Sequence, residues 1–305
     1  MRAVRFDQYG DLDVLQVREV DDPVATAGRV VVRVRAAALN PGENFIRSGA
    51  AAHLWPATFP SGQGSDLAGE VVAIGDGVAG FRVGDAVLGW TDERASHAEL
   101  VAVPAGHLVL KPAQIPWAVA GCMYIAPMAA LAGVRAVAAA AGDVVGVSAA
   151  AGGVGSLTVQ LLRRAGATVI GLAGRDNHEW LRAQGAIPVA YGPGQRERLQ
   201  SAYPGRLDAF IDTFGGGYVD LAVDLGVKPE RINTIIDVAA AHRHGARFEG
   251  SAEVVTADNL AMMADLVAAG AIDIPIARTY PIDRVRDAYA DLNNRHTHGK
   301  IVLIP

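Results

Sequence analysis

A turn of small residues follows an apolar segment near the middle of the chain. Residues 144–147 are apolar, and Ala149, Gly152 and Gly155 then occupy the three positions of the dinucleotide-binding fingerprint, with alanine at the first. Side chains this small let backbone amides approach a pyrophosphate, and a helix N-terminus after the turn offers unpaired N–H groups. An apolar strand before the motif, a helix after it and a second strand one βαβ unit later favour dinucleotide binding over an ordinary tight turn.

The end of the second strand indicates which dinucleotide is bound. Enzymes that use NAD usually place Asp or Glu there to hold the ribose hydroxyls. In this chain Arg175 is the first charged residue after the strand, and a guanidinium suits a 2′-phosphate. Arg175 therefore favours NADPH. Asp176, the next residue, is the alternative, because its carboxylate could hold the ribose of NAD instead.

The residues needed for cysteine or metal chemistry are scarce. Cys122 is the only cysteine, which excludes an internal disulfide and a multi-cysteine metal cluster. His53, His97 and His107 are too scattered along the sequence to suggest a site. We therefore expect no metal in this protein.

The composition argues against several kinds of partner. The 305 residues carry a formal net charge of −5 and no block of Lys or Arg, which argues against nucleic acid. The first nine residues lack the apolar core of a signal peptide. The apolar stretch 118–141 is interrupted by glycine, proline and arginine, so it does not read as a membrane span. We expect a cytoplasmic protein with no membrane partner.

Two kinds of segment must position these residues. The N-terminal third contains short strand-like runs separated by glycine turns, at 3–6, 29–35, 70–74 and 83–89. Short β-branched runs of this kind predict a compact antiparallel barrel.

From about residue 116 the pattern changes to strands that alternate with helices. Strands are predicted at 144–147, 168–172, 209–212 and 232–236, with helices at 153–164 and 178–184. Apolar strands alternating with helices predict a parallel sheet that is covered on both faces. The last fifty residues are predicted to hold a helix at 257–270, a segment at 282–293 and a closing strand at 300–303.

At this point the chain resembles a known family. Residues 40–49 resemble the early substrate-side segment of quinone oxidoreductases, and 64–71 and 81–87 are similar to two core signatures of medium-chain dehydrogenases/reductases. Residues 177–181, 212–216 and 299–303 extend the resemblance along essentially the whole chain. The number and order of these motifs, more than any one of them, indicate the zinc-free quinone oxidoreductase-like branch of that superfamily.

The resemblance implies an α/β fold in two domains. A GroES-like β-barrel catalytic domain is expected from residues 1–117 and 255–305, and a Rossmann domain with a doubly wound parallel sheet from 118–254. The active site is expected in the cleft between them. The family resemblance also implies a homodimer formed by joining two Rossmann sheets near 232–236.

Site residues are carried over from the family position by position. Arg175 falls where relatives place a basic residue for the 2′-phosphate, and Tyr191 matches a tyrosine beside that phosphate. Asn40, Phe45 and Tyr124 are expected on the catalytic side, where Phe45, Tyr124 and Trp55 are candidate walls of an aromatic pocket. The expected cofactor-binding residues are Asn40, Met128, Ala151, Gly152, Gly153, Val154, Gly155, Gly174, Arg175, Tyr191, Phe214, Gly215, Ile235, Asp237 and Lys300.

Departures from the family pattern bear on the chemistry. Zinc-dependent relatives have a cysteine near residue 40 and a cysteine cluster near residue 95, and this chain has Asn40 and no cysteine at 91–97. Many quinone oxidoreductases have a tyrosine in place of Phe45 and a threonine in place of Met128, so two hydrogen-bonding groups are absent here. These changes leave the substrate open.

The resulting hypothesis is an NADPH-dependent oxidoreductase that passes a hydride to a quinone or another electron-poor acceptor without a metal. An enone or enoyl reductase acting on an α,β-unsaturated carbonyl is the first alternative. A non-catalytic NADPH-binding protein is the second.

Overall fold

The computed structural model describes residues 1–305, and its contacts divide the chain into two compact units. Unit 1 comprises Met1–Ile125 and Thr256–Pro305, and unit 2 comprises Ala126–Val255. Residues 118–125, which the sequence analysis assigns to the Rossmann domain, lie in unit 1. They do so because the helix α2 (Trp117–Ala120) packs on the strand β3 (Arg29–Ala38), and the Gly121 carbonyl accepts a hydrogen bond from the Ala38 amide. The assignment of the two domains remains a prediction.

Unit 1 is built around one seven-stranded sheet. Its strand order is β13-β14-β3-β4-β5-β7, and β6 also pairs with β3. Besides β3, the strands are β4 (Asp66–Ile74), β5 (Ala86–Trp90), β6 (Leu100–Pro104), β7 (Leu108–Leu110), β13 (Ile276–Pro281) and β14 (Lys300–Ile304). The inward side chains of β3 to β7, chiefly valine and leucine, form one core.

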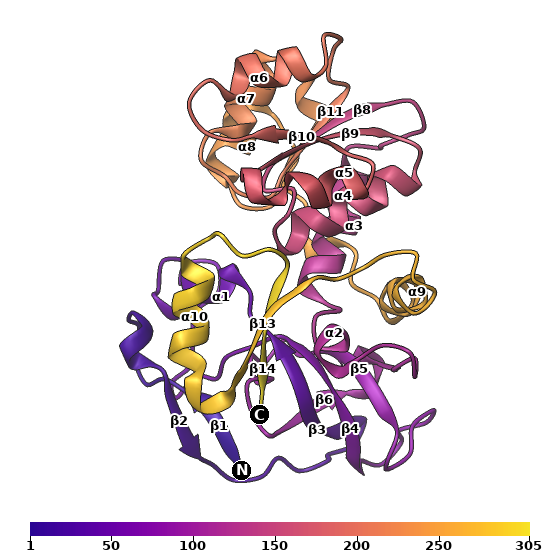
Figure 1. Cartoon of the computed structure of the whole chain (residues 1–305). Coiled ribbons are helices and arrows are strands. Elements are labelled where there is room, and N and C mark those ends of the chain that lie inside the picture. Colours follow the sequence, from indigo (N-terminus) through magenta and orange to yellow (C-terminus); the bar gives the residue numbers. More distant parts are fainter. The chain divides into compact units, whose positions relative to one another are not determined.

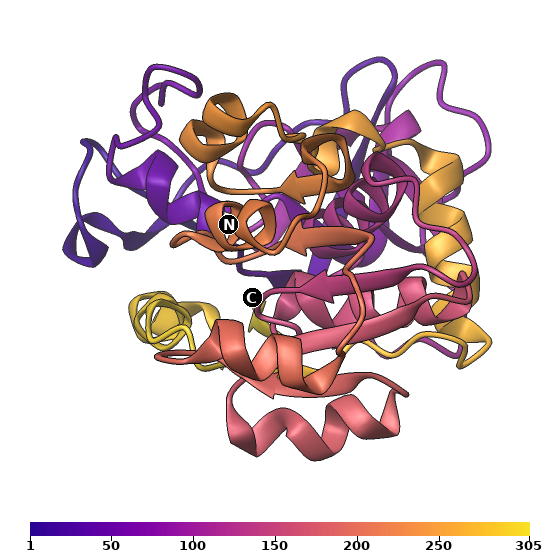
Figure 2. The ribbon, with the colours of Figure 1, turned by 90° about the horizontal axis from the view of Figure 1, so that it is seen from above.

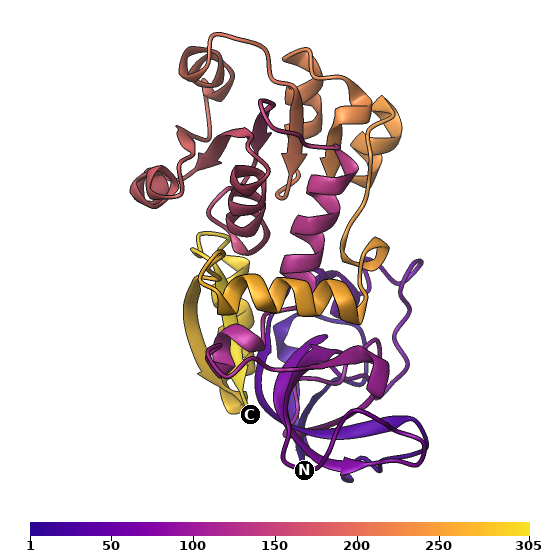
Figure 3. The same cartoon turned by 90° about the vertical axis from the view of Figure 1, so that its right-hand side faces the viewer.

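Smaller elements complete unit 1 (Figure 3). A two-stranded sheet joins β1 (Arg2–Arg5) to β2 (Gln16–Glu19), and α1 (Pro41–Arg47) follows β3 directly. The helix α9 (Ala257–Ala268) packs on β7, and α10 (Val285–Asn293) packs on β13 and β14. A second core forms where α10 meets β1 and β14, and it includes Phe6, Tyr289 and Leu303.

Unit 2 contains a parallel five-stranded sheet with helices on both faces (Figures 1 and 2). The strands are β8 (Val144–Val147), β9 (Thr168–Ala173), β10 (Ile187–Ala190), β11 (Ala209–Asp212) and β12 (Ile232–Thr234), in the order β10-β9-β8-β11-β12. The helices are α3 (Ile125–Ala136), α4 (Gly153–Arg164), α5 (His178–Ala183), α6 (Gln195–Ala202), α7 (Tyr218–Asp224) and α8 (Val238–His244). This is the doubly wound order. The strands stay parallel, but the order in which they are added to the sheet reverses between β8 and β11.

The strands of unit 2 are mostly apolar because both faces of the sheet are buried. Val145 and Val147 of β8 pack with residues of α4 and α5 in one core. Val144, which precedes Val145, packs with residues of α6, α7 and α8 in a second core. The predicted α/β class is confirmed. The sheet of unit 1 is antiparallel except for the parallel pair of β13 and β14, and the separate sheet of unit 2 is parallel.

Several predicted boundaries shift by a few residues. The strand expected at 83–89 begins at Ala86, because Gly84 has a φ of +94° and turns the chain before it. The strand expected at 232–236 ends at Thr234, and the helix expected at 257–270 ends at Ala268. None of the helices has both the length and the hydropathy required to span a membrane.

Candidate functional site

The fingerprint turn links β8 to α4 at the point where the sheet order reverses. The Gly152 amide donates to the Ala149 carbonyl across 2.8 Å, and α4 begins at the next residue. Ala149 has a φ of +43°, in the left-handed region where a side chain is strained, and it stands where the fingerprint usually has glycine. The turn is therefore tight even without glycine at its first position.

Two positions of the turn require glycine for different reasons. A Cβ at Gly155 would lie 2.2 Å from the Ala149 carbonyl oxygen, so the packing of α4 on the turn excludes any side chain there. A Cβ at Gly152 would have one close neighbour, the same oxygen at 3.2 Å, and otherwise open space. The fold thus needs glycine at 155, whereas an open face at 152 is what a ligand approaching the backbone would need.

The first turn of α4 suits an anion. The amides at the start of a helix have no intrahelical partner, and they carry the positive end of the helix dipole. No acidic residue lies in this first turn, and Arg163 and Arg164 lie in the last. The turn and the helix therefore fit the pyrophosphate of a dinucleotide, with Ala151 to Gly155 as the residues that would hold it.

Gly174, Arg175 and Tyr191 gather at the ends of β9 and β10. Arg175 and Asp176 are exposed, in a short 3-10 turn that begins after Gly174. A Cβ built on Gly174 would lie 3.7 Å from the Tyr191 hydroxyl oxygen, so the phenol lies against the backbone just before Arg175. Tyr191 is 46% exposed. The structure brings these three predicted residues together at one sheet edge.

Asp212, at the end of β11, organises the loops on the other side of the reversal point. Its buried carboxylate accepts from the Ser148 hydroxyl at 2.6 Å and the Thr234 hydroxyl at 2.8 Å. It also accepts from the amides of Phe214 and Gly215, each at 3.0 Å. One carboxylate thereby fixes the turns after β8, β11 and β12. The sequence analysis did not single out this role, although an Asp at a strand end before consecutive glycines was visible.

The remaining predicted residues of unit 2 fall into two groups. Ile235 donates its amide to the Asp212 carbonyl, and Asp237 caps α8 by accepting from the Ala240 amide at 3.0 Å. Both follow the carboxyl end of β12, as Phe214 and Gly215 follow that of β11. Met128 lies in α3 and is fully buried, so in this structure its side chain has no surface to offer a ligand.

In unit 1, Asn40 joins two buried charged residues from distant parts of the chain. Its amide nitrogen donates to Asp66 at 2.8 Å, and its amide oxygen accepts from the Lys300 ammonium at 2.6 Å. Lys300 also donates to the Leu39 carbonyl at 2.9 Å. Burial raises the pKa of the Asp66 carboxyl, and the Lys300 charge opposes that rise. Asn40 and Lys300 thus lie together as members of a buried polar cluster, and their assignment to the cofactor site stays a prediction.

A second chain of buried polar groups adjoins Asn40. The Glu43 carboxylate accepts from the Asn40 backbone amide at 2.9 Å and from the Tyr289 hydroxyl at 2.6 Å. That hydroxyl lies 3.5 Å from His97 Nδ1. Burial raises the pKa of Tyr289 well above its usual range, so the phenol stays protonated and acts as the donor. Sequence reasoning missed Glu43, although an Asn followed three residues later by Glu is a capping signature.

The predicted aromatic residues of unit 1 differ in exposure. Phe45 on α1 is 45% exposed and Trp55 is 51% exposed. Tyr124 is buried and stacks on Trp90, with ring centroids 5.7 Å apart. Phe45 and Trp55 are therefore accessible to a ligand, whereas Tyr124 is chiefly part of the packed interior.

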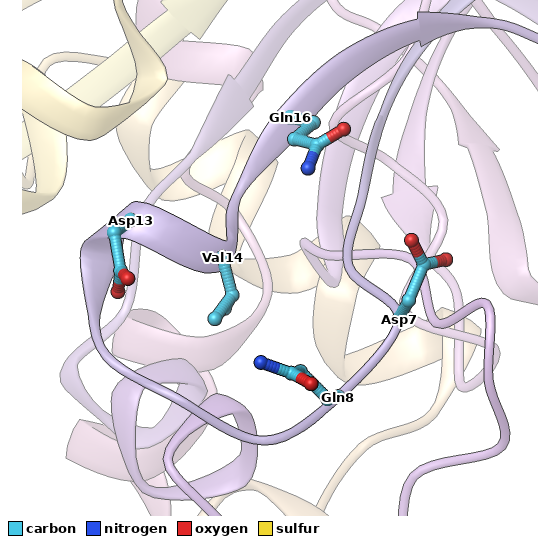
Figure 4. A pocket seen from close by; sticks show the side chains of 5 residues that line it. All are labelled: Asp7, Gln8, Asp13, Val14 and Gln16. Atoms are coloured by element: carbon cyan, nitrogen blue, oxygen red, sulfur yellow. The ribbon is translucent and has the colours of Figure 1, made fainter.

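No group of three or more His, Cys, Asp or Glu side chains is arranged to hold a metal ion. A hollow of about 250 Å³ near the N-terminus is lined by Asp7, Gln8, Asp13, Val14 and Gln16 (Figure 4). Most of these side chains are polar and exposed, and Asp7 is paired with Arg18. This hollow offers no apolar wall for an aromatic ligand.

Two family models match parts of the chain. Residues 26–113 match the alcohol dehydrogenase GroES-like domain, and residues 189–303 match the zinc-binding dehydrogenase model. The Arabidopsis thaliana chloroplastic NADPH-dependent alkenal/one oxidoreductase is 32% identical over the whole chain and 80% of its own length. Human quinone oxidoreductase is 25% identical over the whole chain and 98% of its own.

Solved structures agree in fold. The quinone oxidoreductase of Coxiella burnetii has a TM-score of 0.90 and 29% identity, covering 100% of this chain and 99% of its own. The Escherichia coli quinone oxidoreductase complexed with NADPH has a TM-score of 0.88 at 22% identity, covering both chains fully. With two family models, a relative at 32% identity and this fold, the chain belongs to the quinone oxidoreductase-like branch of the medium-chain dehydrogenase/reductase superfamily.

Proposed function

We propose that this protein is an NADPH-dependent oxidoreductase that transfers a hydride to a quinone or another electron-poor acceptor without a metal. The observation that carries the proposal is the edge of the unit 2 sheet, where the open face at Gly152, the exposed Arg175 and the ring of Tyr191 fit an adenine dinucleotide with a 2′-phosphate. The names of the relatives, quinone oxidoreductase and NADPH-dependent alkenal/one oxidoreductase, support the same reading.

Unit 2 would hold the cofactor. The first-turn amides of α4 would bind the pyrophosphate, and the Arg175 guanidinium would pair with the 2′-phosphate through parallel N–H donors. Asp212 would keep the turns at Phe214 and Gly215 in place, because its carboxylate already accepts from both amides. When bound, NADPH supplies the hydride, so the protein has to position two rings and exclude water.

Unit 1 would supply the acceptor side. Phe45 and Trp55 offer exposed aromatic surface for a flat, electron-poor ring. Asn40 and Lys300 would give that side a fixed polar group, since the hydrogen bond between them holds both side chains in place. A proton for the reduced product would come from solvent, because no exposed acid is placed for it among the predicted residues.

Reduction of an α,β-unsaturated carbonyl is the second candidate. It is favoured by the alkenal/one oxidoreductase at 32% identity and by a 2-methylene-furan-3-one reductase of Solanum lycopersicum at 30%. The same residues would serve either acceptor.

We further propose a homodimer joined at the β12 edge of the sheet, and a cytoplasmic location.

The decisive experiment is an NADPH-oxidation screen over simple quinones and enones, followed by identification of the product. Turnover of quinones alone supports the first candidate, and turnover of enones alone supports the second. Tight NADPH binding without oxidation by any acceptor would contradict both and leave a non-catalytic NADPH-binding protein.

A further inference from the structure

One arginine holds the whole loop that carries Tyr191. The Arg198 side chain, on α6, donates to four successive backbone carbonyls: Ala190 at 2.9 Å, Tyr191 at 3.2 Å, Gly192 at 3.1 Å and Pro193 at 2.7 Å. The first carbonyl belongs to the last residue of β10, and the other three belong to the loop between β10 and α6.

The loop needs this support because its backbone is unusual. Gly192 has a φ of +96° and Gly194 a φ of +76°, so the glycines on both sides of Pro193 adopt a left-handed conformation that other residues rarely take. Apart from the bonds to Arg198, the loop is held by the Gly192 amide donating to Gln195 Oε1 at 3.1 Å and by the Gln195 amide donating to the Gly192 carbonyl at 2.9 Å. Without the guanidinium, each of the four carbonyls would lose a donor, although the Gly192 carbonyl would keep the Gln195 amide.

Arg198 is not paired with a carboxylate. It forms no ion pair, and its four hydrogen-bond acceptors are all neutral carbonyls. The Glu197 carboxylate lies in the neighbourhood, since its Oε2 and Arg198 Nη1 lie 3.8 and 3.1 Å from the position of a Gly194 Cβ. Arg196, two residues earlier on the same helix, is instead paired with the Asp224 carboxylate at 3.4 Å. A guanidinium that meets only carbonyl dipoles still contributes a full positive charge to its surroundings.

The position of the loop bears on the proposed cofactor site. Its first residue, Tyr191, lies against Gly174, with 3.7 Å between the phenol oxygen and the position of a Gly174 Cβ. Arg175 follows Gly174 directly. A shift of the loop would therefore move Tyr191 away from the place proposed for the 2′-phosphate.

We propose that Arg198 is a specificity-determining positioning residue for NADPH, which fixes Tyr191 beside Arg175 and adds an unpaired positive charge near the 2′-phosphate. The inference rests on the proposed NADPH site. Arg198 acts through the loop and through its charge, without touching the phosphate itself.

The test compares two probes that differ only in the 2′-phosphate. Binding of 2′,5′-ADP and 5′-AMP to the full chain is measured by calorimetry for the parent, Arg198→Ala, Arg198→Lys and the control Arg196→Ala, each checked by circular-dichroism melting. We expect the parent to prefer 2′,5′-ADP, and Arg198→Ala to lower that preference by about five- to tenfold, which corresponds to roughly 1–1.4 kcal/mol. Arg196→Ala should keep the parental preference.

Arg198→Lys separates the positioning of the loop from the effect of the charge, because lysine keeps the charge but cannot reach four carbonyls. We expect an intermediate preference that retains the parental salt dependence, and this variant replaces the alanine variant if the latter does not fold. An equal weakening of both probes, or an unchanged preference with a lower melting temperature, would make Arg198 purely structural and overturn the inference alone. A parent that binds both probes equally would overturn the phosphate site, and the inference with it.

Discussion

The Lys300 ammonium donates to the Asn40 amide oxygen across 2.6 Å, although 260 residues separate them in the sequence. The strand register explains the meeting. In the antiparallel pair of β14 and β3, Val302 lies opposite Ala38 and Leu303 opposite Ala37, so the same register continues to Lys300 opposite Asn40. Glycine at 299 lets the chain just before Lys300 pass close to Pro275, because a Cβ there would lie 2.0 Å from the Pro275 carbonyl oxygen.

This contact predicts a pH-dependent role for Lys300 in stability. Burial raises the pKa of Asp66 above its ordinary value of 3.8, and Lys300 opposes the rise. A carboxyl whose pKa is raised on folding contributes most stability below its unfolded pKa, and that contribution is lost as the pH rises through the folded pKa. Lys300→Met should raise the folded pKa further and so extend the loss to higher pH. We expect urea unfolding to show a larger loss relative to the parent at pH 8 than at pH 5.

The control for this variant is Lys228→Met, which removes an exposed lysine of unit 2. It should change stability little, and by the same amount at both pH values. An equal loss at pH 5 and pH 8 for Lys300→Met would mean that lost packing, rather than the charge beside Asp66, accounts for the effect.

The sequence predicted the parallel sheet better than the rest of the fold. Strand β8 contains only valine and glycine, and β11 is apolar up to its last residue, Asp212, because both faces of the sheet are buried. The predicted bounds of both strands agree with the structure residue for residue. The helices α6, α7 and α8 were not predicted. They are short, and α6 buries only Leu199, so no long apolar stripe marks it in the sequence.

The candidate site could be predicted only where it is local in sequence. The turn at Ala151 to Gly155 and the neighbours Gly174 and Arg175 follow from a single βαβ unit. The joining of Asn40 to Asp66 depends instead on how β3 and β4 pair, which no local pattern gives. The role of Arg198 depends on four carbonyls that become visible only once the loop is folded.

The two glycines of the turn should respond differently to substitution. Gly152→Val should abolish NADPH binding with little loss of stability, because the side chain would enter the open face where the pyrophosphate is expected. Gly155→Ala should destabilise unit 2 itself, by about 1–3 kcal/mol, since its Cβ would collide with backbone. Fluorescence titration with NADPH and chemical unfolding distinguish the two. Parental NADPH affinity in Gly152→Val would place the cofactor elsewhere.

Metal removal should leave the protein active. The prediction rests on Asn40 standing where zinc-dependent relatives have cysteine, and on a single cysteine in the chain. Elemental analysis of protein purified without added metal should find far less than one zinc per chain, and activity should survive dialysis against a chelator. Stoichiometric zinc, with activity lost to the chelator and restored by zinc, would contradict the assignment.

Cys122 should be unreactive in the native protein. Burial raises the pKa of its thiol to about 12, so at pH 8 roughly one molecule in ten thousand carries the thiolate that thiol reagents attack. A disulfide-exchange reagent such as DTNB should label the native chain slowly and the guanidinium-unfolded chain within the mixing time. Fast labelling under native conditions would show that this part of unit 1 opens readily.

Arg175 should set the preference for NADPH over NADH. It is exposed, forms no ion pair and follows Gly174 beside the ring of Tyr191, where the adenosine ribose is expected. Because charge-assisted pairing with a phosphate is partly screened at an exposed site, Arg175→Ala should weaken NADPH binding by about tenfold and leave NADH nearly unchanged. Added salt should weaken NADPH binding more in the parent than in the variant.

Asp176→Ala is the matched test of the competing assignment, in which Asp176 holds the ribose of NAD and repels the phosphate. Under that assignment the parent would prefer NADH, and Asp176→Ala would be the change that admits NADPH. Titrating both cofactors into the parent and the two single variants decides between the two assignments. If Arg175→Ala leaves the ratio of NADPH to NADH affinity unchanged, the phosphate is held elsewhere.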